Sequence, residues 1–157
     1  MDETKAGVEA LCLDTDWRSI NYGRSLAKGK PIMYRRINVF RVNKLQKLIE
    51  TTGWRPNIVL VSGLYEYHPD SAVKKSLYDI EHSLELGGLI LFFCQADNPS
   101  KKLMKKLGRT KGGTPWTLFY RKPNELQAWM AEAGFTDINI SVDRWGMYLT
   151  CCGRKSR

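Results

Sequence analysis

The segment from residue 57 to residue 93 constrains the fold more than any other part of the chain. An apolar run, Ile58–Val61, ends at Ser62-Gly63, and an amphipathic helix and a second apolar run, Leu89–Phe93, follow. Two apolar strands joined by a helix form a βαβ unit, which requires a parallel sheet covered on both faces. Ligands of such sheets bind beyond the carboxyl ends of the strands. The sequence therefore predicts an α/β fold with a ligand site near Ser62–Tyr67.

Strand and helix patterns alternate through the rest of the chain. Strands are expected at 11–13 and 32–37, and helices at 17–28, at 42–52, from 70 onward and from 123 to 133. Asp16 and Asp70 are the expected N-caps of two of these helices. Alternating apolar residues at 138–142 and 147–151, joined by the turn Asp143–Gly146, predict an antiparallel hairpin. We predict one domain, residues 1–157, with a mostly parallel sheet that ends in this hairpin.

Composition excludes several classes of protein. None of the apolar runs in the 157 residues approaches the roughly 20 residues that span a bilayer, and the acidic N-terminus is not a secretory signal. The four cysteines show no paired CxxC spacing, and there are only two histidines. A zinc site or a disulfide framework is therefore not expected. We predict a cytoplasmic protein with no metal.

The net charge of +9 is concentrated in Lys101–Lys111 and in the C-terminal tail. Such a patch could bind phosphate backbones, which makes nucleic acid a candidate partner. The alternative is a solvated helix face with Leu103, Met104 and Leu107 turned inward. We favour the alternative, because no aromatic residue interleaves the basic cluster as a stacking platform would require.

Several separated motifs carry a resemblance to a known family. They are VSGLYEYHPD followed by a helix, TPW with the later Arg121, AEAGF at 131–135 and DRWGMY at 143–148. With these motifs the chain resembles class I S-adenosylmethionine-dependent methyltransferases, specifically a bacterial methyltransferase family whose members sometimes carry an α/β-hydrolase-like domain. The resemblance covers about residues 11–151. It implies a Rossmann-like methyltransferase fold, S-adenosylmethionine as cofactor, and methyl transfer to a small-molecule or lipid-like acceptor.

The resemblance also implies which residues bind the cofactor. Asp14 corresponds to the carboxylate that accepts both ribose hydroxyls, with Asp16 as the alternative. Asn38 stands where the family has an Asp for the adenine amino group, and Val39 would flank the adenine ring unless it only packs at the strand end. Ser62 and Gly63 would lie under the methionine part, where glycine lets the backbone approach the ligand.

The transfer site and the acceptor pocket follow from the same resemblance. Tyr65 and Glu66 are the predicted catalytic residues, with aromatic packing and local capping as their structural alternatives. His68 is a third candidate base. Residues Gln95, Trp116 and Arg121 would shape the acceptor pocket; the family's arginine run is reduced here to Phe119-Tyr120-Arg121.

One family feature has no counterpart in the sequence. No G-x-G-x-G occurs, so the first strand, its glycine-rich loop and its helix are predicted to be missing. The chain would then be a fragment, or would receive the missing segment from another chain or partner domain, or would close its second and fourth strands together. A non-catalytic remnant that acts as a basic interaction module is therefore the alternative function.

Overall fold

The computed structural model describes residues 7, 9–41 and 44–156. The chain divides into two compact units, with the boundary between Lys44 and Leu45. The strand pairing gives each unit its own sheet, one of two strands and one of four. Each unit is described by itself below.

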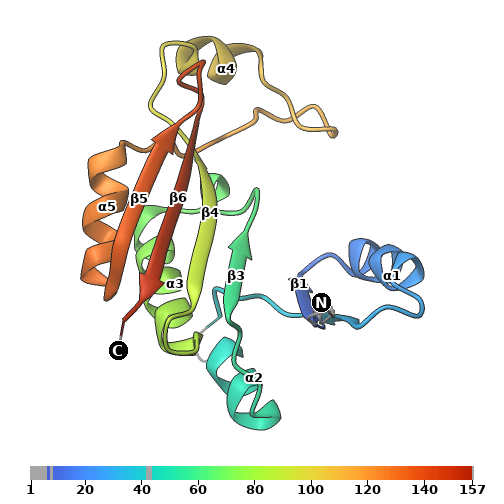
Figure 1. The fold of residues 1–157 in the computed structure, drawn as a ribbon. Helices are drawn as coiled ribbons and strands as arrows, with labels where there is room; N and C mark the ends of the chain where they lie inside the picture. The colour runs from blue at the N-terminus through green and yellow to red at the C-terminus, as the bar shows by residue number, and fades with distance from the viewer. Residues whose placement is uncertain (1–6, 8, 42–43, 157) are drawn as a thin grey trace, which may run out of the picture. The chain divides into compact units, whose positions relative to one another are not determined.

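The first unit is a βαβ arrangement (Figure 1). It consists of β1 (Ala10–Asp14), α1 (Trp17–Leu26) and β2 (Ile32–Arg36). The two strands are parallel, with Ala10 opposite Ile32 and Asp14 opposite Arg36. Asp16 caps α1, as predicted, because its side chain accepts the backbone N–H of Arg18. The helix ends two residues before the predicted Lys28, and Gly29 follows in the left-handed region with φ of 79°.

The second unit carries a four-stranded sheet in the order β3-β4-β6-β5. Its elements are α2 (Lys44–Thr52), β3 (Ile58–Val61), a 3-10 turn η1 (Tyr65–Tyr67), α3 (Asp70–Ser83), β4 (Leu89–Gln95), α4 (Lys101–Leu107), α5 (Pro123–Glu132), β5 (Phe135–Val142) and β6 (Tyr148–Lys155). β3 and β4 are parallel, whereas β6 is antiparallel to both β4 and β5. The predicted hairpin is confirmed, and β6 is the reversed strand of this sheet.

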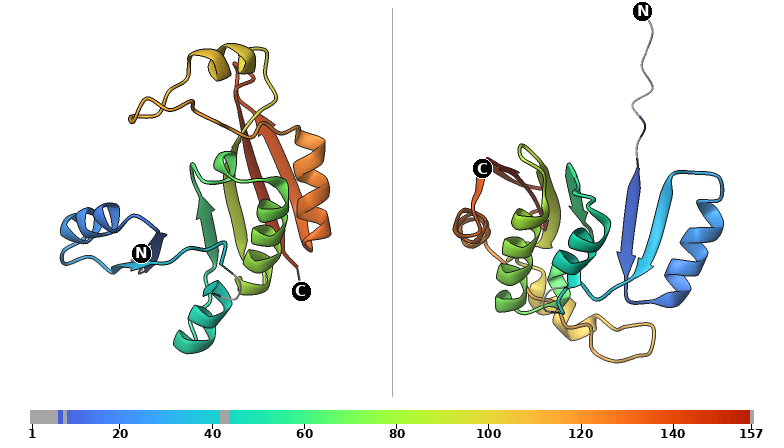
Figure 2. Two further views of the ribbon diagram at one scale, coloured as in Figure 1. Left: turned by 180° about the vertical axis from the view of Figure 1, so that it is seen from behind. Right: turned by 90° about the horizontal axis from the view of Figure 1, so that it is seen from below.

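Helices α3 and α5 lie on one face of the four-stranded sheet (Figure 2). The strand side chains that face them are fully buried, among them Ile90, Phe92, Leu149 and Cys151. Leu77 of α3 and Leu126 of α5 are buried with them. These apolar residues form the core of the second unit, to which α5 and the residue after it also contribute Trp129, Met130 and Ala133.

The other face of β3 is open. Ile58 is 64% exposed and Leu60 is 60% exposed, whereas Val61 is buried. The prediction that this strand is covered on both faces is therefore wrong for the described residues. The reason is that α3 and α5 share one face and that β3 is an edge strand, paired only with β4.

Two further local predictions are corrected. The N-cap of α3 is Pro69 rather than Asp70, which is the first helical residue and pairs with Arg121. On α4, Leu103 and Leu107 are exposed rather than turned inward, so the helix does not bury the predicted apolar face. With only seven residues, α4 is attached mainly through Met104, whose sulfur accepts the hydroxyl of Tyr120. Residues 42 and 43, the predicted start of the helix at 42–52, lie outside the described residues.

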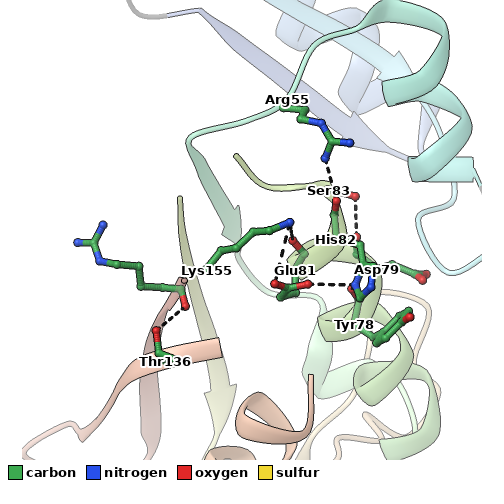
Figure 3. Close-up of polar contacts among 9 residues, drawn as sticks. Arg55, Tyr78, Asp79, Glu81, His82, Ser83, Thr136 and Lys155 are labelled. Atoms are coloured by element: carbon green, nitrogen blue, oxygen red, sulfur yellow. Dashed lines mark hydrogen bonds and ion pairs between the residues drawn. The ribbon is translucent and has the colours of Figure 1, made fainter. Parts of the chain in front are cut away.

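A polar cluster fixes the last turn of α3 (Figure 3). Lys155 Nζ donates to the carbonyl of Glu81 at 2.8 Å and lies 4.0 Å from its carboxylate. Arg55 donates to the carbonyl of His82 at 2.9 Å, and Nδ1 of His82 lies 3.0 Å from the Glu81 carboxylate. Cations at a helix C-terminus satisfy its free carbonyls. The cluster therefore joins α3 to β6 and to the segment before β3.

Candidate functional site

The carboxyl ends of β3 and β4 lie at one edge of the sheet, because the two strands are parallel and in register. Ser62 and Gly63 follow β3, and Gln95 ends β4. Gly63 has φ of 63°, and a Cβ added there would meet no atom within 4 Å. The glycine is thus required by its backbone conformation, and the space beside it is open.

Tyr65 lies in the core beneath this edge. It is fully buried, its ring packs edge-on against Phe92 at 5.2 Å, and its hydroxyl pairs with Ser76 Oγ at 3.0 Å. Burial raises the pKa of this phenol. These contacts give Tyr65 a packing role. None of them bears on catalysis, so its catalytic role stays a prediction.

Glu66 and Gln95 each hold a buried oxygen that has no hydrogen-bond partner among the described residues. Glu66 is 8% exposed and Gln95 is 1% exposed. Buried polar atoms of this kind are uncommon in folded proteins and require an explanation, such as a ligand or a catalytic role. The two residues therefore place unused acceptors at the edge where the sequence predicts the transfer site.

Arg121 organises the loop that follows β3. It is 1% exposed, and its guanidinium donates to the carbonyl of Tyr65 at 2.8 Å, to the carbonyl of His68 at 2.6 Å and to the Asp70 carboxylate at 3.1 Å. The recipients are Tyr65 in η1, His68 directly after it and Asp70 at the start of α3. The predicted substrate contact of Arg121 is untested, but its hydrogen bonds are used to hold this loop. His68 is partly buried, which lowers its pKa, and the Arg121 charge adds to this.

Trp116 lines an open hollow of about 610 Å³ beside η1. The other lining residues are Tyr67, Arg109, Thr110, Lys111, Pro115 and Thr117. The insertion is tied to η1 because Phe119 N donates to the carbonyl of Glu66 at 2.7 Å. The sequence predicted Trp116 here but missed Tyr67, Arg109 and Lys111. The basic run was visible in the sequence, whereas its proximity to Tyr67 depends on the fold.

In the first unit, Asp14 ends β1 with an exposed side chain. One carboxylate oxygen accepts the backbone N–H of Asp16 at 2.9 Å, and the Asp14 carbonyl accepts the backbone N–H of Ile37. The predicted adenine residue Asn38 is therefore adjacent to Asp14 at the carboxyl end of this sheet. The second carboxylate oxygen has no partner in the part of the chain that the structure describes, which leaves an acceptor for a ribose hydroxyl.

Asn38 and Val39 lie in the turn after β2. The Asn38 side-chain oxygen accepts the backbone N–H of Phe40 at 3.0 Å, so the acceptor expected for adenine already has one partner. An amide oxygen can accept a second hydrogen bond. Val39 is half-buried, which agrees equally with strand-end packing and with contact to an adenine ring.

A protein-family model described as "Putative methyltransferase" matches residues 4–155. The chain belongs to this family. The match includes both sheets and the insertion, so the family assignment rests on nearly the whole sequence and confirms the predicted resemblance.

The chain is also similar to one curated relative and, in its fold, to solved structures. The uncharacterized protein YnbC of Escherichia coli K12 is 32% identical over 96 residues, which is 60% of this chain and 16% of YnbC. The S-adenosylmethionine-dependent methyltransferase SibL has a TM-score of 0.72 at 15% identity, over 96% of this chain and 44% of SibL. Magnesium protoporphyrin IX methyltransferase of Synechocystis PCC 6803, solved with SAH, has a TM-score of 0.68 at 12% identity. This match covers 96% of this chain and 65% of the solved chain.

The solved structures establish the fold, which is the Rossmann-like methyltransferase fold predicted from the sequence. The chain spans about a sixth of YnbC and about half to two thirds of the two solved chains. None of the described helices combines the length and the apolar character needed to cross a membrane. Within the described residues no three His, Cys, Asp or Glu side chains are grouped as metal ligands.

Proposed function

We propose that the chain works as an S-adenosylmethionine-dependent methyltransferase, or as the C-terminal part of one, and transfers a methyl group to a small-molecule acceptor. The observation that carries this proposal is the pair of unpartnered buried oxygens on Glu66 and Gln95. Both oxygens lie near the carboxyl ends of β3 and β4, where ligands of parallel sheets bind. They can accept hydrogen bonds from the molecule that receives the methyl group, and the Glu66 carboxylate can also take its proton.

Asp14 is the proposed anchor of the adenosine. Its free carboxylate oxygen suits a ribose hydroxyl, because a carboxylate is an acceptor with no donor of its own. Asn38 and Val39, which follow the next strand of the same unit, would contact the adenine. In the second unit, Ser62 and Gly63 stay the residues predicted for the methionine part. The donor and acceptor types present therefore fit the cofactor.

When bound, S-adenosylmethionine supplies a methyl group on a sulfonium, which a held and aligned nucleophile can attack directly. Glu66 would take the proton that the acceptor loses as its bond to the methyl carbon forms. Buried at the strand end, Glu66 is better suited to this than Tyr65, whose hydroxyl pairs with Ser76.

Calorimetric titration of the full chain with S-adenosylhomocysteine tests the cofactor assignment. Asp14→Asn keeps the hydrogen bond to Asp16 but removes the charged acceptor, so we expect affinity to fall about tenfold or more. Glu9→Gln is the matched control, because it removes one exposed carboxylate from the same unit. No heat at millimolar ligand would contradict cofactor binding by this chain, and equal affinity of Asp14→Asn would contradict the role of Asp14.

We propose in addition that a further parallel strand completes the sheet at β3, supplied by another segment or by a partner domain. The unpaired edge of β3 and the exposed side chains of Ile58 and Leu60 support this. Unpaired edges with apolar side chains are templates for strand addition. The edge of β1 opposite β2 is unpaired as well within the described residues.

A further inference from the structure

The hollow beside η1 has a composition that points to one class of ligand. Its volume of about 610 Å³ lies within the range of small-molecule sites. Residues from η1 and from the insertion after α4 form its walls, so it adjoins the loop that carries Glu66. Glu66 itself does not line the hollow, but the next residue along η1, Tyr67, does.

Two aromatic side chains form one wall. Trp116 Nε1 donates to the hydroxyl of Tyr67 at 3.3 Å, which joins the two side chains across the loop and the insertion. The backbone N–H of Trp116 bonds to the carbonyl of Gly108, where a side chain would lie 3.3 Å from Trp116 Cβ. A side chain at residue 108 would lie still closer, 2.5 Å, to the carbonyl oxygen of Met104, so the glycine is required there by the end of α4 as well. Trp116 and Tyr67 together offer aromatic area to a flat molecule.

Two cations form the rim. Arg109 donates through one nitrogen to the carbonyls of Lys106 and Gly108, at 3.1 and 2.8 Å, which orients its guanidinium. Within the described residues, neither Arg109 nor Lys111 forms an ion pair, and no carboxylate lines the hollow. The neighbouring α4 adds four more lysines, of which Lys101 is paired with Asp97. The rim is therefore positive and has donors available.

We propose that this hollow binds a flat aromatic acceptor that carries an oxyanion, such as a carboxylate. The inference rests on the proposed methyl transfer and names its substrate class. The rings provide stacking area, and the guanidinium and ammonium groups provide charge-assisted hydrogen bonds to an oxyanion. The rim explains how the chain binds an anion although the family's arginine run is reduced at residues 119–121.

A single-stranded nucleic acid uses the same chemistry, since its bases stack and its phosphates attract cations. The small molecule is favoured because the aromatic wall holds two rings at one place rather than a row of platforms along the basic helix. An oligothymidylate titration decides between them.

The test uses 2-naphthoate and its neutral analogue 2-naphthamide, each titrated into the full chain by calorimetry. We expect the acid to bind about tenfold tighter than the amide, and Arg109→Gln/Lys111→Gln to remove that difference. Lys28→Gln/Lys30→Gln is the matched control, because it removes two exposed cations from the first unit and leaves the hollow intact. Trp116→Leu should weaken both ligands, whereas Trp116→Phe should retain part of the affinity.

Each outcome separates this inference from the proposed function. Binding of S-adenosylhomocysteine without binding of 2-naphthoate would overturn the acceptor class and leave the methyltransferase proposal intact. Equal binding of acid and amide, or displacement of 2-naphthoate by a lower concentration of oligothymidylate, would also overturn it. Binding of 2-naphthoate that depends on Arg109 and Lys111, without binding of S-adenosylhomocysteine, would support the hollow as an anion site and contradict the cofactor assignment.

Discussion

At the scale of single residues, Arg121 shows how one buried charge organises a functional loop. Its three recipients lie 51 to 56 residues earlier in the chain, and its guanidinium also lies 5.6 Å from the Trp129 ring centre. A planar guanidinium suits this task because several donors leave it in fixed directions. Arg121 thereby holds η1, on which Glu66 and Tyr67 are carried.

We expect Arg121→Met to lower the free energy of unfolding by about 3 kcal/mol, because one buried carbonyl and one partly buried carbonyl lose their donor. Urea denaturation of the full chain measures this change. The matched variant is Arg144→Met, which loses only an exposed contact with Trp145 and should cost less than about 1 kcal/mol. Similar costs for the two variants would show that Arg121 does not hold the loop.

Cys94 gives a prediction about pH. Burial raises the pKa of its thiol to about 12, and the nearby Arg121 opposes that shift. The folded state therefore favours the neutral thiol, so this contribution to stability is complete below the ordinary pKa of about 9 and is lost as pH rises toward 12. Between pH 9 and 11 we expect a loss of up to about 1.4 kcal/mol per pH unit from this group.

Unfolding at pH 8 and pH 10 measures the effect, with Cys94→Ala as the comparison. The variant should be less stable at pH 8 but should lose less stability on the change to pH 10. The buried Cys151 thiol remains in both proteins; its pKa is raised mainly by burial and further by Cys94, so the variant also loses the smaller, Cys94-dependent part of the Cys151 shift. Identical slopes for the two proteins would contradict the assignment to Cys94.

At the scale of elements, β3 differs from the prediction made for it, because its apolar sequence predicted a strand covered on both faces. It is a short strand with one buried face and one open face, and its outer edge is unpaired in the described residues. Such an edge can pair with another chain. We infer that β3 is the element through which the protein would receive a completing strand.

We expect the full chain to self-associate with increasing concentration and Leu60→Lys to remain monomeric, because a charge on an open edge strand blocks edge pairing. Sedimentation velocity over a concentration series measures the association. Leu86→Lys is the matched control, since Leu86 is 74% exposed and lies in the turn before β4. The proposal fails if both variants associate like the parent chain.

At the scale of the whole molecule, the methyltransferase family and fold are established, whereas the acceptor and the completing strand are proposals. The chain divides into two compact units, and the prediction that residues 1–157 form a single domain stays a prediction. Part of the charge of +9 lies in the second unit, where Arg109 and Lys111 line the hollow at Trp116. The exposed Leu103 and Leu107 show that α4 is a loosely attached carrier of that charge rather than a core helix.

The sequence alone determined the features that depend on local pattern. Apolar runs and turn residues predicted β3, β4 and the hairpin, and Asp16 was recognised as a cap because capping involves residues two positions apart. The motifs identified the family for a similar reason, since each is a contiguous stretch of chain. Element ends were less accurate, as with Lys28 and Asp70, because tertiary contacts decide where a helix ends.

Only the tertiary structure decided which side chains meet. The hydrogen bonds of Arg121 with Tyr65 and of Trp116 with Tyr67 join residues 56 and 49 positions apart. The buried oxygen of Glu66 that has no partner among the described residues also follows from the fold. No periodicity in the sequence encodes such distances, because they depend on how α3, β4 and the insertion fold back onto η1. The open face of β3 could not be predicted for the same reason, because an apolar strand has the same sequence pattern whether or not a helix covers it.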